Sequence, residues 1–133
     1  MVLRFILAAL LLLLPASLSA HHSFAAEFDS AKPVVLRGKV TKVAWMNPHV
    51  YLWVDAVDEN GKITNWALES AAPIYLQGLG WTKLSLKAGD RVTVRAFRSK
   101  DLPNQAKTDA VTLPDGRVVT TGHVNDGQDA GSR

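Results

Sequence analysis

The chain has 133 residues, and its first 20 residues contain 16 of its 63 apolar residues. Without that block the apolar fraction is about 42%, an ordinary value for a water-soluble domain. The other 113 residues suffice for one hydrophobic core but are too few for a doubly wound nucleotide-binding domain or a (β/α)8 barrel. They carry 14 Lys and Arg against 12 Asp and Glu, and this small surplus does not indicate a polyanionic partner such as nucleic acid.

The N-terminal block has the order of a secretory signal peptide. Residues 1–4 carry one positive charge, residues 5–14 are an unbroken apolar run, and residues 15–20 supply a proline and small side chains. A run of this length is too short to span a hydrocarbon core of about 30 Å as a helix. We therefore predict cleavage after Ala20, a periplasmic or secreted location, and no transmembrane segment in the mature protein. Cleavage after Ser19 is the alternative.

The chain contains no cysteine. This excludes disulfides, thiolate metal sites and cysteine nucleophiles. An exported domain of this kind must be stabilised by its hydrophobic core alone.

The first half of the mature chain predicts three strands. Residues 34–45 are rich in β-branched side chains, and their alternation slips near Gly38, as expected of a bulged strand. Residues 49–57 alternate cleanly between apolar and other side chains. Residues 58–61 end in Asn-Gly and predict a tight turn into a third strand over residues 63–69.

The second half predicts a short helix followed by further strands. Residues 70–78 are the predicted helix, with Ser70 as its cap and Pro73 in its first turn. The rest of the chain divides into an added helical turn over 81–86, a strand over 91–98, a polar loop over 99–107, a strand over 108–113, a return strand over 117–121 and a disordered tail over 122–133.

Three strands, a helix and two strands is the element order of the OB-fold, a five-stranded Greek-key barrel. We therefore predict an all-β domain with one short helix, a small antiparallel OB-like barrel over residues 34–121. Residues 21–33 form an N-terminal arm in this interpretation, and we expect a monomer. An open antiparallel sheet is the alternative, because strand order cannot be read from one sequence.

Several short segments resemble a family of small exported bacterial proteins that is known only as a domain of unknown function. The resemblance covers about residues 21–121, and its most specific part is the Trp-x-Asn-Pro-His segment. The segments are residues 21–24 (HHSF), 27–29 (EFD), 32–33 (KP), 45–49 (WMNPH), 65–69 (NWALE), 80–81 (GW), 86–90 (LKAGD) and 112–117 (TLPDGR). The resemblance implies export and a compact β domain, and it implies no activity.

Histidines at the predicted mature terminus suggest a metal site. Cleavage after Ala20 leaves His21 and His22 first, so a free amine and an imidazole can chelate Cu(II), with His49 as a further nitrogen donor. Cleavage after Ser19 leaves Ala20-His21-His22, which can bind Cu(II) or Ni(II) through amine, amide and imidazole nitrogens. Oxygen ligands can come from Glu27, Asp29 or Glu69. The alternative is a solvated arm that binds nothing.

Aromatic and basic side chains suggest a second kind of site. Tyr51 and Trp53 share one face of the predicted second strand, and Arg95 and Phe97 share one face of the predicted fourth strand. Such a face of an OB-fold can stack sugars or bases. Because an exported protein rarely meets nucleic acid, a glycan, a peptide or an envelope protein is the expected partner. The alternative is that these aromatic rings contribute only to packing.

Enzymatic motifs are missing from the sequence. It contains no G-x-S-x-G, P-loop, dinucleotide fingerprint or H-E-x-x-H pattern. We therefore assign no catalytic residue and predict a binding or accessory protein rather than an enzyme.

Overall fold

A computed structural model of the chain describes residues 23–121. The predictions for the signal peptide, for His21 and His22 and for the C-terminal tail lie outside the described residues. The elements in chain order are α2 (Phe24–Glu27), β1 (Phe28–Ala44), β2 (Tyr51–Val57), β3 (Ile63–Glu69), α3 (Pro73–Gly78), β4 (Arg91–Ser99), β5 (Gln105–Thr112) and β6 (Val118–Thr120).

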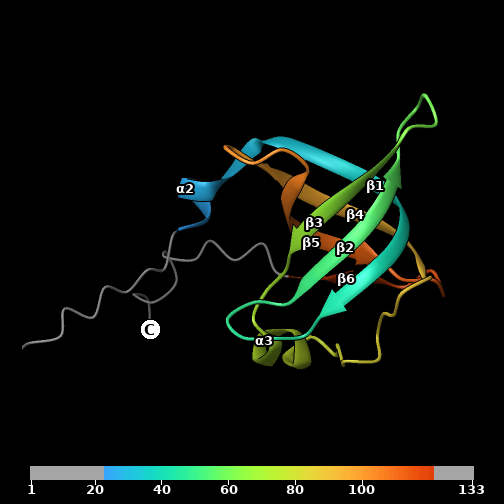
Figure 1. The fold of residues 1–133 in the computed structure, drawn as a ribbon. Coiled ribbons are helices and arrows are strands. Elements are labelled where there is room, and N and C mark those ends of the chain that lie inside the picture. Colours follow the sequence, from blue (N-terminus) through green and yellow to red (C-terminus); the bar gives the residue numbers. More distant parts are fainter. Residues whose placement is uncertain (1–22, 122–133) are drawn as a thin grey trace, which may run out of the picture.

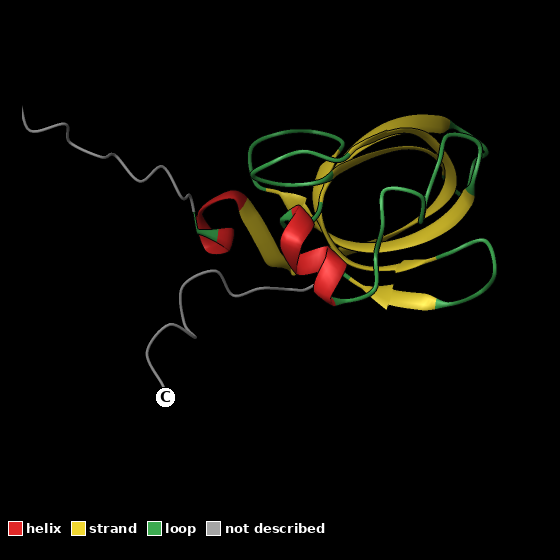
Figure 2. Ribbon diagram, turned by 90° about the horizontal axis from the view of Figure 1, so that it is seen from below, coloured by secondary structure: helices red, strands yellow, loops and turns green. Residues whose placement is uncertain are grey.

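The strands form one mostly antiparallel sheet whose first five members close into a ring (Figures 1 and 2). The long strand β1 pairs with both β2 and β4, β2 pairs with β3, and β4 pairs with β5, always antiparallel. A short parallel pairing of β3 with β5 completes the ring, and β6 extends it at β5. The helix α3 lies at one end of the ring (Figure 1). The prediction of a mainly antiparallel β domain is confirmed.

Strand β1 pairs with β2 on one side and with β4 on the other, and it coils sharply at Gly38. Gly38 is opposite Ala56 of β2 and Val92 of β4 at the same time. A Cβ atom at Gly38 would lie 2.0 Å from the carbonyl oxygen of Asp55, so only glycine allows this approach. The bulge lies between Val40 and Lys42, slightly later than the slip predicted near Gly38.

The interior of the ring is filled by one side-chain face of each strand, as the alternation predicted. Strand β2 alternates between partly exposed and buried positions from Tyr51 to Ala56, and β4 does the same from Val92 to Ala96. The core residues are Leu36, Val40, Val50, Leu52, Val54, Ala56, Trp66, Leu68, Ala71, Leu76, Trp81, Leu86, Val92, Val94, Ala96, Ala106, Val111 and Leu113.

Several predicted element bounds need correction. Strand β1 begins at Phe28 rather than at residue 34, because Phe28 and Pro33 pair with β4, with a register irregularity between them that local alternation does not reveal. Strand β2 begins at Tyr51 rather than at residue 49, and β5 begins at Gln105 rather than at residue 108, where it pairs with the end of β3.

The helical predictions are correct only in part. Helix α3 begins at Pro73, which occupies the first turn as predicted. Ala72 is the residue that precedes it, and no side chain caps the helix, so the predicted cap at Ser70 is wrong. Residues 81–86 form a turn closed by a hydrogen bond from the Ser85 amide to the Thr82 carbonyl (3.0 Å) rather than a further helical turn.

Candidate functional site

A row of outward-facing side chains crosses four neighbouring strands beside the β1–β2 loop. Tyr51 of β2 is opposite Glu69 of β3, Glu69 is opposite Lys107 of β5, and Lys107 is opposite Phe97 of β4. Opposed residues point to the same side of a sheet. The next row, which contains Leu52 and Leu68, faces the core, so the Glu69 row lies on the outer surface of the ring.

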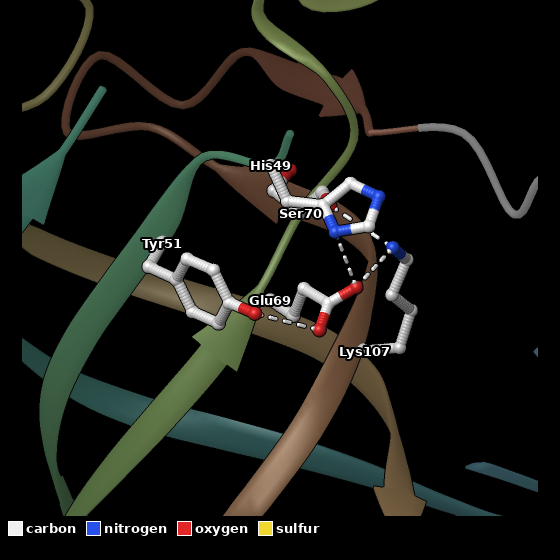
Figure 3. A network of polar contacts seen from close by, with 5 residues as sticks. All are labelled: His49, Tyr51, Glu69, Ser70 and Lys107. Carbon is white, nitrogen blue, oxygen red and sulfur yellow. Dashed lines mark hydrogen bonds and ion pairs between the residues drawn. The ribbon is translucent and has the colours of Figure 1, made fainter. Parts of the chain in front are cut away.

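The carboxylate of Glu69 is the centre of a polar network (Figure 3). The ammonium group of Lys107 donates to Glu69 Oε1 (2.8 Å) and to the backbone oxygen of Ser70 (3.0 Å). The hydroxyl of Tyr51 donates to Glu69 Oε2 (2.9 Å). The Nδ1 atom of His49 lies 3.0 Å from Glu69 Oε1. Both carboxylate oxygens are therefore held by neighbouring groups. We call His49, Tyr51, Glu69 and Lys107 the Glu69 network.

The ion pair inside this network is buried although it lies outside the ring. Glu69 is 6% exposed and Lys107 is 4% exposed. Burying two opposite charges removes their hydration, so such a pair persists only when additional hydrogen bonds satisfy it. Tyr51 and the Ser70 carbonyl supply those bonds here. The network is consequently rigid and sensitive to the loss of any member.

Tyr51 remains protonated and acts as a donor in this setting. Burial, the hydrogen bond to Glu69 and the negative charges of Glu69 and Glu27 together raise the pKa of Tyr51 well above its ordinary value. The hydroxyl therefore keeps its proton at neutral pH and donates to Glu69.

His49 presents one ring nitrogen to Glu69 and the other away from it (Figure 3). A carboxylate beside Nδ1 favours the tautomer that carries the proton on Nδ1, which leaves Nε2 as a free electron-pair donor. The side chain of His49 is 29% exposed, so a ligand can approach it from solvent. This carboxylate–histidine arrangement is the one that commonly orients a metal-binding imidazole.

The four residues predicted for an aromatic and basic face do not form one patch. Tyr51 and Phe97 share the row of the Glu69 network, whereas Trp53 and Arg95 lie on opposite sides of that row. The ring of Trp53 lies 5.9 Å from that of Tyr51, between centroids, and the ammonium group of Lys42 lies 4.7 Å from its centre.

Arg95 and Phe97 are engaged with neighbouring parts of the chain. Arg95 forms an ion pair with Asp109 of β5. Phe97 packs edge-on against Phe24 of α2, with 5.7 Å between ring centroids. Phe24 also contacts Phe28. The segment that contains α2 thus lies against the outer face of β4, next to the row of the Glu69 network.

Sequence reasoning missed Lys107, the partner that makes the network possible. It placed this residue at the end of a polar loop over residues 99–107. The parallel pairing with β3 is the interaction that makes residues 105–107 a strand, and no local pattern indicates it.

A family match covers residues 10–108 and therefore includes all four residues of the Glu69 network. The chain belongs to the family of unknown function DUF6152. Neither a curated protein nor a solved structure matches the chain.

Among residues 23–121, no helix is long and apolar enough to cross a membrane. The same residues contain no group of three or more His, Asp or Glu side chains placed to hold a metal ion.

Proposed function

We propose that this DUF6152 protein is an exported accessory module that binds Cu(II) through His49 and the histidines of its mature N-terminus, His21 and His22. The observation that carries the proposal is the position of Glu69 Oε1, 3.0 Å from His49 Nδ1. This contact directs the other ring nitrogen away from the carboxylate and toward an incoming ligand.

The path of the N-terminal segment supports the proposal. Phe24 packs on Phe97. In the outer row, Phe97 of β4 is separated from Glu69 of β3 by the intervening strand β5, so the two residues are about 10 Å apart at ordinary strand spacing. His21 and His22 precede Ser23 directly, and two extended residues span about 7 Å before the length of a side chain is added. These lengths put His49 within reach of the terminal histidines.

The donor set suits copper. Cleavage after Ala20 would supply the free amine and the imidazole of His21, and His49 Nε2 would complete a set of three nitrogens, which Cu(II) accepts in tetragonal geometry. Cleavage after Ser19 would supply the chelate of Ala20, His21 and His22. Glu69 is occupied by Tyr51 and Lys107, so its role in this proposal is to orient His49.

The test is a Cu(II) titration of mature protein purified from periplasm, with its N-terminus sequenced to establish the cleavage site. We expect H49A and the double variant H21A/H22A each to lower the affinity for Cu(II) at least tenfold. H123A removes a histidine that the proposal does not use, and it should bind as the wild type does. Unchanged affinity in H49A or in H21A/H22A would overturn the proposal.

We also propose that the ring of strands is an OB-like barrel. The support is the strand order, in which β1 pairs with β2 and β4, β3 runs parallel to β5, and α3 lies between β3 and β4 in the chain. An experimental structure tests this directly. Loss of the β3–β5 pairing in that structure would contradict it.

A second candidate is a ligand-binding surface at Tyr51 and Trp53. It is favoured by the proximity of the two rings and by the cation of Lys42 over Trp53, an arrangement on which a sugar or peptide can stack. Titration of soluble glycans, followed by tryptophan fluorescence, tests it. Quenching that is lost in W53A supports this candidate, and quenching that persists in W53A contradicts it.

A further inference from the structure

The outer face of β1 and β4 carries three cations that lie close together. Lys39 of β1 is directly opposite Arg91 of β4, and Arg37 is the next outward residue along β1. Like charges directly opposite each other on an antiparallel pair destabilise the sheet. A protein that keeps such a pair has a local excess of positive charge that an anion would relieve.

Among the described residues, the neighbouring carboxylates form no ion pair with these cations. Lys39 has Asp55 of β2 opposite it on its other side, but Asp55 Oδ1 accepts a hydrogen bond from Asn65 Nδ2 (2.7 Å). Within residues 23–121, none of Arg37, Lys39 and Arg91 forms an ion pair, although six other ion pairs are present there. Asp90 adjoins Arg91, but it accepts hydrogen bonds from the amide (2.9 Å) and the ammonium group (3.1 Å) of Lys87. Those bonds hold the pKa of Asp90 below its ordinary value and direct its charge toward Lys87.

A surface hollow lies over this part of the sheet. Its volume is about 760 Å³, and Arg37, Arg91, Thr93 and Thr112 are among the residues that line it. Asp90, whose carboxylate accepts the hydrogen bonds from Lys87, also lines it. Arg37, Thr93 and Thr112 form one row across β1, β4 and β5. The hydroxyls of Thr93 and Thr112 donate no hydrogen bond to any of the described residues. The turn at Gly89 and the one at Pro114 border the hollow.

We propose that this hollow binds a phosphorylated anion with two or more negative charges. The guanidinium groups of Arg37 and Arg91 match the geometry of phosphate oxygens, and Lys39 adds a third charge beside them. The hydroxyls of Thr93 and Thr112 can donate to further oxygens. The net charge of the chain is small and does not indicate this site, because its acidic residues offset most of its lysines and arginines.

This site is separate from the proposed copper site. Thr93 is four residues from Phe97 along β4, about 13 Å at the ordinary rise of a strand. Neither proposal uses a residue of the other. The failure of one therefore leaves the other intact.

The test uses two probes, sodium tripolyphosphate and vesicles of phosphatidylglycerol, with phosphatidylcholine vesicles as the uncharged comparison. We expect tripolyphosphate to raise the Tm of the protein at low ionic strength. The double variant R37Q/R91Q should bind at least tenfold more weakly. The matched variant K62Q/K83Q loses the same charge at two exposed lysines that do not line the hollow, and it should bind as the wild type does.

The two probes distinguish the sources of phosphate. Binding of tripolyphosphate without sedimentation on phosphatidylglycerol vesicles supports a soluble phosphorylated ligand. Sedimentation that tripolyphosphate reverses and that R37Q/R91Q abolishes supports a lipid headgroup. Binding of neither probe overturns the proposal, and so does an equal loss of binding in R37Q/R91Q and K62Q/K83Q.

A second measurement needs no ligand. Because Arg91 faces Lys39, R91Q should raise the Tm of the free protein by about 1–5 °C at low salt, and added salt should remove the difference. K83Q should leave the Tm unchanged. A lower Tm in R91Q would show that Arg91 stabilises the fold by itself, which would overturn the inference.

Discussion

Removal of the buried ammonium group of Lys107 tests how the outer face of the ring is stabilised. K107M keeps most of the side-chain volume but leaves the charge of Glu69 without its cation, although both groups are almost fully buried. Breaking a buried pair in this way costs about 3–5 kcal/mol of unfolding free energy. For a domain of this size the loss corresponds to roughly 15–30 °C in Tm.

Urea unfolding followed by tryptophan fluorescence measures this loss, because Trp66 and Trp81 are buried and report on the core. K62M is the matched control at an exposed lysine and should change stability by less than about 0.5 kcal/mol. The double variant E69Q/K107M should lose less than the sum of the two single variants, because the two residues act as a pair. A loss below about 1 kcal/mol in K107M, or strict additivity, would show that the buried pair does not stabilise the outer face of the ring.

Four further predictions concern Tyr51, Gly38 and Arg95. Y51F should lose about 1.5–3 kcal/mol, because it removes a hydrogen bond to a charged acceptor, and urea unfolding at pH 7 measures this. The pKa of Tyr51 is raised in the folded protein, so above pH 10 this hydroxyl loses its proton in the unfolded chain before it does so in the folded protein. The free energy of unfolding of the wild type should therefore fall with rising pH more steeply than that of Y51F. Equal slopes would contradict this. G38A should lose at least about 2 kcal/mol, because its Cβ meets backbone, whereas G78A has open space around its Cβ and should change little. R95Q should lose less than about 1 kcal/mol, because its pair with Asp109 is exposed on the arginine side, and a larger loss by thermal melting would disagree.

Local patterns predicted the strands that alternate and the turns that need special backbone angles. The alternation in residues 51–57 identified the inward face of β2, and Gly61 adopts the positive φ of 79° that the Asn-Gly turn required. Pro73 was placed in the first turn of α3 for the same local reason, its fixed backbone angle. These features depend on a few consecutive residues and can be read from the sequence.

The errors occur where distant segments pair. Residues 28–33 contain Pro33 and several polar side chains and show no alternation, yet they join β1 because β4 lies beside them. Lys107 became part of a strand through its parallel pairing with Glu69, which is 38 residues away. His49 and Glu69 were each considered as ligands, but their contact depends on the loop that precedes β2 and could not be foreseen.

In the proposed function, His49 Nε2 and the terminal histidines bind one copper ion together. Electron paramagnetic resonance of the mature protein with one equivalent of Cu(II) tests this joint binding, because nitrogen hyperfine coupling reports how many imidazoles are bound. We expect a nitrogen-rich tetragonal spectrum that loses one imidazole donor in H49A and stays unchanged in H123A. Identical spectra for the wild type and H49A would contradict it.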